Sequence, residues 1–95
     1  MRIARVDNNQ PEIVAALRKA GAVVKHTHTI KNLFDILVFH KGKIYCVEIK
    51  DSKQPKSKRR LTTGEEQCRS DMEGAGVKYW VITSAEGALK MIAQK

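Results

Sequence analysis

The fold of this 95-residue chain is decided by residues 33–50, whose sequence is LFDILVFHKGKIYCVEIK. Two apolar runs, Leu33 to Phe39 and Ile44 to Lys50, flank the short connection His40-Lys41-Gly42-Lys43. Strand-forming residues on both sides of a short connection that contains glycine are typical of a β-hairpin. We therefore expect an antiparallel pair of strands in the middle of the chain.

The register of this hairpin determines which charged side chains meet. Opposed residues in a hairpin lie equally far from the turn, so if His40 faces Lys43, Asp35 faces Glu48. Their Cβ atoms would then be about 4.5–5.5 Å apart on one face of the sheet. Lys50 lies two residues beyond Glu48 and so projects from the same face. A register shifted by one residue would instead send Asp35 to the opposite face.

Asp35 and Glu48 are the candidate catalytic carboxylates. Facing like charges repel each other, and both residues lie within otherwise apolar runs. A divalent cation between the two carboxylates would remove this repulsion, and hard oxygen ligands suit Mg²⁺ or Mn²⁺. Lys50 would add the positive charge that stabilises a phosphoryl-transfer transition state. The alternative is that each acidic residue is a solvated side chain near the end of a strand.

The segment that precedes the hairpin is predicted to form a helix and a strand. Ile13 and Leu17 recur at helical spacing and Gly21 is a favoured helix terminator, so we expect a helix over about 10–20. The β-branched residues of segment 22–28 predict a strand.

The segment that follows the hairpin is predicted to contain a loop, two helices and one further strand. Residues 51–60 lack large apolar side chains, which indicates a solvated loop. Thr63 and Glu66 have the spacing of a capping box, which opens a helix over about 63–75. A strand over 77–83 and a short last helix complete the order α-β-β-β-α-β-α. We expect one α/β domain over residues 1–95.

Histidines and cysteines give a weaker signal. His26 and His28 share one face of their predicted strand, which suits a transition metal, but two histidines without a further nearby ligand are more typical of structural or surface residues. Cys46 and Cys68 have no metal-ligand spacing and, without a secretion signal, indicate reduced thiols. We therefore expect an intracellular, cytoplasmic protein, associated with the nucleoid or encoded by a phage in its host cell.

The net charge indicates a polyanionic partner. Eighteen Lys and Arg residues against ten Asp and Glu residues give a net charge of +8, with a pI near 9.8. Basic side chains near phosphates release condensed counterions, which drives binding to nucleic acid. No apolar run approaches the roughly 20 residues that span a bilayer, and no segment combines a basic helical face with an apolar one. Nucleic acid is therefore favoured over a membrane as the partner.

The hairpin motif resembles the core of a known nuclease superfamily. Asp35 followed by Glu48-Ile49-Lys50 matches the D…(D/E)-x-K pattern of the PD-(D/E)XK nucleases. Over nearly its whole length the chain resembles a stand-alone VRR-NUC domain, and its first helix and hairpin are similar to Holliday-junction resolvases. Besides the motif, the residues that carry this pattern are Asp7-x-Asn9-Gln10, Glu12-Ile13-Val14, Leu17-Arg18, Gly21-Ala22-x-Val24, Asp51, and Leu61-Thr62 with Gln67.

The resemblance implies a restriction-endonuclease-like fold, in which helices flank a mixed central sheet. It implies that Asp35, Glu48 and the backbone carbonyl of Ile49 bind Mg²⁺ or Mn²⁺. Lys50 would orient or polarise the attacking water. Gln10, on the first helix, takes the place of a glutamate that completes the metal site in related nucleases.

The implied activity is metal-dependent DNA cleavage by an endonuclease, selective for branched DNA such as Holliday junctions and acting as a homodimer. Gln67, on the second helix, would help to position the scissile strand. Basic residues after the catalytic strand would contact the DNA backbone, the alternative being a solvated loop with no partner. These residues are Lys53, Lys56, Lys58, Arg59 and Arg60.

The chain departs from the family pattern just before Asp35. Phe34 stands where the family has a proline, and Lys31-Asn32-Leu33 replaces the usual glycines. The loop that approaches the phosphate is therefore expected to have another shape, which affects substrate choice more than catalysis.

Two functions of other classes compete with the nuclease. One is a non-catalytic nucleic-acid-binding module that retains the nuclease fold. The other is an accessory subunit or anti-nuclease whose basic surface binds an acidic protein. The intact set of Asp35, Glu48 and Lys50 argues against the first, because a retired site has no reason to keep unpaired buried charge.

Overall fold

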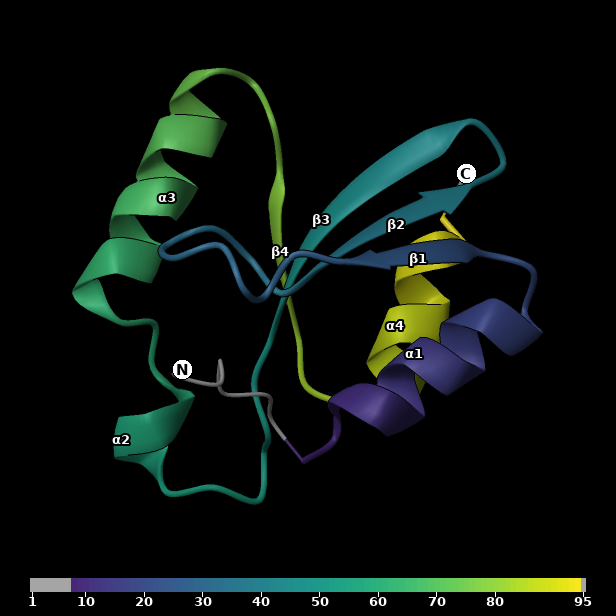
Figure 1. The fold of residues 1–95 in the computed structure, drawn as a ribbon, viewed down its shortest axis with the longest axis horizontal. Coiled ribbons are helices and arrows are strands. Elements are labelled where there is room, and N and C mark those ends of the chain that lie inside the picture. The colour runs from purple at the N-terminus through teal and green to yellow at the C-terminus, as the bar shows by residue number, and fades with distance from the viewer. Residues whose placement is uncertain (1–7, 95) are drawn as a thin grey trace.

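The computed structural model describes residues 8–94, except the side chain of Lys58, so Asp7 of the sequence pattern lies outside it. The predicted order α-β-β-β-α-β-α is confirmed (Figure 1). A further short helix, α2, lies inside the segment expected to be a loop, because Pro55 starts a single helical turn there. The elements are α1 Gln10–Lys19, β1 Val23–His26, β2 Ile36–His40, β3 Lys43–Ile49, α2 Lys56–Arg59, α3 Thr63–Gly74, β4 Tyr79–Ile82 and α4 Ala85–Ile92.

The sheet is mixed, as expected. Its four strands lie in the order β1-β2-β3-β4. β1, β2 and β3 are successively antiparallel, whereas β4 runs parallel to β3. Parallel neighbours need a crossover connection, and the segment that holds α2 and α3 supplies it.

The hairpin has the register predicted from the sequence. His40 pairs with Lys43 and Ile36 with Val47. Just before the ladder, the Asp35 N–H donates to the Val47 carbonyl at 2.9 Å, so Asp35 and Ile36 share one partner residue on β3. Both turn residues between the strands have positive φ, 49° and 77°, as a two-residue hairpin turn of the favoured twist requires. Asp35, just before this ladder, therefore lies beside the end of β3 that carries Glu48.

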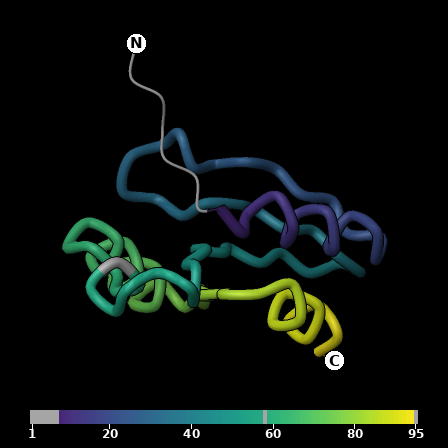
Figure 2. The backbone as a smooth tube through the Cα atoms, turned by 90° about the horizontal axis from the view of Figure 1, so that it is seen from below, coloured from purple at the N-terminus to yellow at the C-terminus, as the bar shows by residue number. Residues whose placement is uncertain are grey.

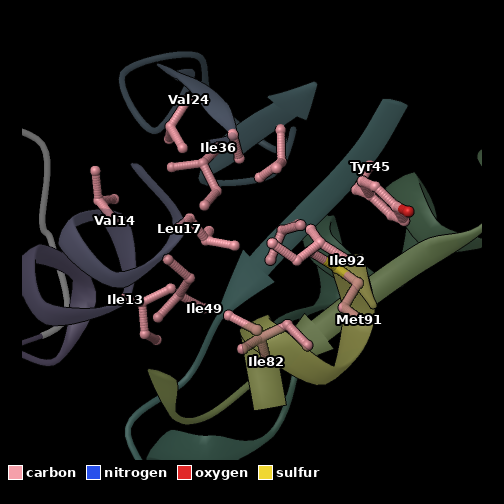
Figure 3. Packing of buried hydrophobic residues seen from close by; sticks show 14 residues of the cluster. Ile13, Val14, Leu17, Val24, Ile36, Tyr45, Ile49, Ile82, Met91 and Ile92 are labelled. Atoms are coloured by element: carbon pink, nitrogen blue, oxygen red, sulfur yellow. The ribbon is translucent and has the colours of Figure 1, made fainter. Parts of the chain in front are cut away.

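The hydrophobic core lies on one face of the sheet, where α1 and α4 pack side by side. Inward-facing strand residues interleave with the apolar stripes of both helices (Figure 3). Each fully buried aliphatic side chain contributes roughly 1.5–3 kcal/mol to this packing. The core residues are Ile13, Val14, Leu17, Ala22, Val24, Ile36, Val38, Tyr45, Val47, Ile49, Ile82, Ala88, Met91 and Ile92.

The other face of the sheet carries the polar site and an exposed apolar strip. α3 lies at the end of the molecule opposite to α1 and α4 (Figures 1 and 2), and none of its twelve residues, all of which the structure describes, is buried. Val23 and Ile44, on the part of this face away from α3, are 49% and 65% exposed. The site therefore lies between a packed half of the molecule and a lightly packed one.

The capping box that starts α3 is one residue earlier than predicted. The Thr62 hydroxyl accepts from the Glu65 N–H at 3.2 Å, and the Glu65 carboxylate accepts from the Thr62 N–H at 2.9 Å. Thr63 and Glu66 have the same spacing, but Glu65 also contacts a buried lysine from the end of β3. The contact between Glu65 and this lysine therefore decides which of the two possible capping boxes forms. Within residues 8–94, no helix has the length and apolar composition needed to cross a bilayer.

Candidate active site

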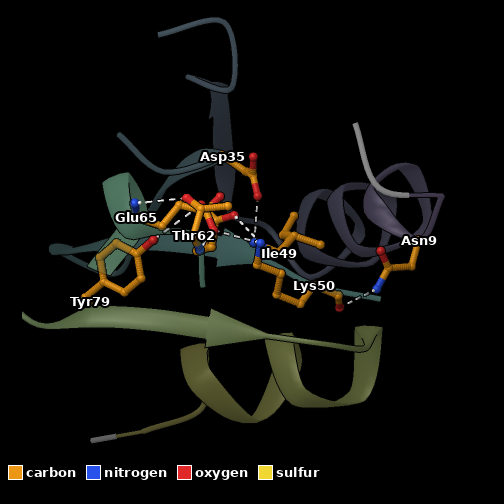
Figure 4. A network of polar contacts seen from close by, with 8 residues as sticks. Asn9, Asp35, Ile49, Lys50, Thr62, Glu65 and Tyr79 are labelled. Carbon is orange, nitrogen blue, oxygen red and sulfur yellow. Dashed lines mark hydrogen bonds and ion pairs between the residues drawn. The ribbon is translucent and has the colours of Figure 1, made fainter. Parts of the chain in front are cut away.

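Asp35 lies immediately before β2 and is held by the backbone of β3. Its Oδ2 accepts a hydrogen bond of 2.7 Å from the Ile49 N–H (Figure 4). Burial raises the pKa of Asp35, although this hydrogen bond opposes the shift. The hydrogen bond fixes Oδ2 and thereby the orientation of the whole carboxylate.

Glu48 is the most deeply buried acidic residue of the site, with only 4% of its surface exposed. The Tyr79 hydroxyl donates to Glu48 Oε1 at 3.4 Å, and the Glu48 and Asp35 carboxyl groups are within hydrogen-bonding reach of each other. Burial, together with the charges of Asp35 and Glu65, raises the pKa of Glu48 to about 9. Two carboxyl groups in this position share either a proton or a cation.

Lys50 is a buried ammonium group placed between two acids. Its Nζ is 2.8 Å from Glu65 Oε1 and 3.6 Å from Glu48 Oε2. Its backbone N–H donates to the Ile82 carbonyl, and its own carbonyl accepts from the Asn9 side-chain amide at 3.1 Å. Both the backbone and the charged end of Lys50 are therefore fixed.

Glu65 is the residue of this site that sequence reasoning missed. Burial opposes its ionisation, but the Lys50 ammonium and the Thr62 N–H outweigh burial and lower the pKa of Glu65. The signal in the sequence is the spacing of Thr62 and Glu65, which fits a capping box as well as the spacing of Thr63 and Glu66 does. Nothing local to residues 61–67 indicates that this helix start meets the end of β3.

A pocket of about 160 Å³ lies beside the two carboxylates. Acidic side chains from β3 and α3 form part of its wall, and the loop between β1 and β2 forms the rest. The lining residues are His28, Ile30, Lys31, Asn32, Leu33, Phe34, Asp35, Glu48, Thr62 and Glu65. This pocket brings the predicted pair of acids together with the loop in which the sequence departs from the family pattern.

The donor set fits a hard divalent cation. Asp35 and Glu48 offer carboxylate oxygens that lie close to each other, and the Ile49 carbonyl belongs to the same strand end. Within residues 8–94, no three His, Cys, Asp or Glu side chains converge into a complete metal cage. Mg²⁺ does not need one, since it commonly binds through one or two carboxylates and keeps water or phosphate oxygens as its other ligands.

The two glutamines predicted for the site have different surroundings. Gln10 is buried, with its Nε2 3.4 Å from His26 Nδ1 and its Oε1 buried without a hydrogen-bond partner among the described residues. Gln67 is exposed and donates to Asp71 Oδ1, one turn further along α3. Neither glutamine lines the carboxylate pocket.

The predicted DNA-binding segment follows the site directly in the chain. Asp51 is buried and its Oδ1 accepts from the Lys53 N–H at 2.9 Å, which turns the chain after β3. Lys53, Lys56, Arg59 and Arg60 are all exposed, and the Lys58 side chain lies outside the described part of the structure. The segment presents positive charge at the same end of the molecule as α3 (Figure 1).

Comparison with known proteins identifies the fold. No protein-family model and no curated protein sequence matches the chain. A solved structure described as a VRR_NUC domain is similar to it with a TM-score of 0.66 and 17% sequence identity, over 93% of this chain and 98% of the other. At this identity the likeness establishes the fold alone, and the predicted fold, with its mixed sheet flanked by helices, is confirmed.

Proposed function

We propose that this chain, which has the fold of a VRR_NUC domain, is a metal-dependent endodeoxyribonuclease selective for branched DNA such as Holliday junctions. The observation that carries the proposal is the meeting of Asp35 and Glu48 beside the ammonium group of Lys50. Burying two acids side by side is costly unless a cation or a proton is held between them. A nuclease makes direct use of such a pair.

In this proposal Asp35, Glu48 and the Ile49 carbonyl hold Mg²⁺ or Mn²⁺. The bound ion would supply a Lewis acid that lowers the pKa of a water molecule and offsets charge on the phosphate. The Ile49 N–H keeps Asp35 in a fixed orientation, and Tyr79 does the same for Glu48. Gln10 would complete the site from α1 with its buried Oε1, which has no hydrogen-bond partner among the described residues.

Lys50 is proposed to orient the attacking water and to stabilise negative charge that develops on the phosphate. The contact with Glu65 supports this role, because it holds a long flexible side chain in one position before substrate arrives. A preorganised charge does not have to be reoriented during the reaction.

Two properties support DNA as the substrate and a homodimer as the active form. The net charge of +8 and the exposed basic segment after β3 favour a phosphate backbone, with Gln67 near the path of the strand. The exposed Val23 and Ile44 on the open sheet face favour a second copy, because apolar strips of this kind commonly mark interfaces. A dimer would present two centres to the two strands of a junction.

A non-catalytic DNA-binding module is the second candidate. The exposed basic residues of the segment after β3 would serve this function without any chemistry at the carboxylates. An intracellular, DNA-associated location accompanies either function.

One assay separates these two functions. The protein is incubated with supercoiled plasmid and with a labelled four-way junction, in Mg²⁺, Mn²⁺ or EDTA. We expect metal-dependent cleavage that Lys50→Ala abolishes and that Lys41→Ala, an equal charge change in the exposed hairpin turn, retains. Tight binding of the junction with no cleavage in either metal would identify a binding module instead.

A further inference from the structure

We propose that His28 contacts the scissile phosphate and donates a hydrogen bond from its Nε2–H to a phosphate oxygen. The inference deepens the proposed nuclease function and rests on it for the identity of the phosphate. It assigns a role to the loop between β1 and β2, where this sequence departs from the family pattern. The ligand class is a phosphodiester of a nucleic-acid strand.

The position of His28 is the first support. It is a half-buried side chain that lines the same 160 Å³ pocket as Asp35, Glu48 and Glu65. Three acids line this pocket, Asp35 from the end of the loop, Glu48 from β3 and Glu65 from α3, and the loop also contributes His28 and Lys31 as donors. Donors facing a metal-binding pair of acids suit a ligand that is itself rich in acceptor oxygens.

The loop is tied down at its base. The Thr27 N–H donates to the Asp35 carbonyl at 2.8 Å, and the Thr27 hydroxyl donates to the Phe34 carbonyl at 2.7 Å. The Ile30 N–H donates back to the Thr27 carbonyl at 3.0 Å, which closes a turn around His28. His28 is therefore carried by a bonded turn next to Asp35 rather than by a free loop.

The loop is also tied down at its far end. Asn32 adopts a left-handed backbone conformation with φ of 60°. Its side-chain amide packs onto Gly64, in the first turn of α3, so closely that no Cβ would fit there. The loop thus spans the space between the hairpin and α3 (Figure 1), and its residues line the pocket.

The His28 ring itself indicates which nitrogen meets a ligand. The ring packs edge-on against His26, with 5.5 Å between centroids. Its Nδ1 is buried without a hydrogen-bond partner among the described residues. A buried N–H without a partner is rarer in proteins than a buried acceptor without one, so the lone pair belongs on Nδ1 and the proton on Nε2. In the proposed contact this half-buried residue, which lines the pocket, donates through Nε2–H.

Histidine-detected NMR tests the contact independently of cleavage. Protein labelled with ¹⁵N-histidine is titrated with a short DNA duplex in EDTA, and Glu48→Gln protein is titrated with Mg²⁺ present. His28→Ala assigns the His28 signals by their loss. We expect the Nε2 signal of His28 to move with DNA while that of His40, which borders the hairpin turn far from α3 (Figure 1), stays in place.

Kinetics with three variants gives the second readout. We expect His28→Ala to lower kcat by about ten- to a hundredfold with little change in KM, the size of effect expected for one lost donor to a charged group. His28→Gln keeps an N–H donor and should recover most of the loss, and His40→Ala should behave as wild type.

Two outcomes would overturn the contact. One is an unmoved His28 signal while other signals respond to DNA, and the other is equal kcat loss in His28→Ala and His28→Gln with reduced thermal stability in both. Absence of cleavage in the wild type, with a DNA-dependent shift of His28, would refute the nuclease proposal and leave the phosphate contact standing.

Discussion

The Glu48 carboxyl group is buried in an environment that disfavours its ionisation. It is buried beside one acid, near a second, and within 3.6 Å of a single ammonium group. Its pKa of about 9 means that the metal-free protein holds a proton on Glu48 at neutral pH. Metal binding would have to displace this proton, so binding and protonation compete for the same oxygens.

The raised pKa of Glu48 predicts that the stability of the metal-free protein depends on pH. The pKa of Glu48 is raised from 4.5 to about 9 on folding, so its contribution is complete below pH 4.5 and is lost as the pH rises toward 9. In EDTA we expect the free energy of unfolding to fall between pH 5 and 9, with a slope of up to about 1.4 kcal/mol per pH unit. Asp35, whose pKa is also raised, changes stability with the same sign.

Urea denaturation at several pH values measures this slope. Glu48→Gln keeps the shape of the side chain and cannot ionise, so its profile should be flatter over the same range. Glu86→Gln, on the exposed face of α4, should retain the wild-type slope. A wild-type profile that does not fall between pH 5 and 9 would show that Glu48 ionises normally.

The start of α3 couples helix formation to the site. Glu65 closes the capping box and holds Lys50 with the same oxygen, Oε1. Glutamine serves in a capping box as well as glutamate does, whereas alanine cannot. We therefore expect Glu65→Ala to lower the free energy of unfolding by about 1 kcal/mol more than Glu65→Gln does, measured by urea denaturation followed by circular dichroism.

Glu66 provides the matched control for this prediction. It is exposed, and its ion-pair partner in the same helix is Arg69 at 3.9 Å, so Glu66→Ala should change stability by less than about 0.5 kcal/mol. If Glu66→Ala were the more destabilising variant, the capping box would be the Thr63–Glu66 pair that the sequence suggested.

The sequence predicted the features that depend on residues close together in the chain. The hairpin register follows from a two-residue turn and alternating apolar residues, so the approach of Asp35 to the end of β3 is predictable from residues 33–50 alone. Glu65 could not be found in this way, because its contact with Lys50 joins residues fifteen positions apart through the packing of α3. Gln67 was predicted from the family resemblance, and its amide bonds Asp71 along the helix, so its role toward the DNA strand stays a prediction.

The basic segment around α2 makes a prediction about salt. Arg59 and Arg60 are exposed, and each phosphate contact that they make adds about one unit to the slope of log K against log salt concentration. Replacing both with alanine should weaken junction binding broadly and reduce this slope by about two units.

The hairpin turn supplies the control for this measurement. Replacing Lys41 and Lys43 with alanine removes the same charge from the opposite end of the molecule (Figure 1). Fluorescence anisotropy at several salt concentrations compares the two double variants. Equal slopes in the two would mean that the DNA path does not follow α2.

At the scale of the whole molecule, the uneven packing of the two sheet faces predicts an association. The face opposite the core leaves Ile44 65% exposed, so Ile44→Glu should cost little stability in an isolated chain. In a homodimer joined through this face it would bury a charge and separate the subunits. We expect light scattering to give about twice the chain mass of 10.7 kDa for the wild type and the chain mass for Ile44→Glu.

Measuring the mass of the wild type at the protein concentrations used for cleavage shows whether the dimer is the form that is assayed. Lys19→Glu, at the exposed end of α1 on the other side of the sheet, is the control for the introduced acid. A wild-type chain that is monomeric at all concentrations used for cleavage would contradict the dimer and leave the chemistry of each centre unaffected.

The side chain of Asn9 has a consequence for how the centre comes into being. Its amide donates to the carbonyls of Lys50 and Thr83, which follow it by 41 and 74 positions and lie just past the ends of β3 and β4. A growing polypeptide therefore cannot close this clasp until its fourth strand has been synthesised. The bond to the Lys50 carbonyl needs only the first 50 residues, so the bond to Thr83 is the later of the two, and the complete clasp is a late product of the chain's own biosynthesis.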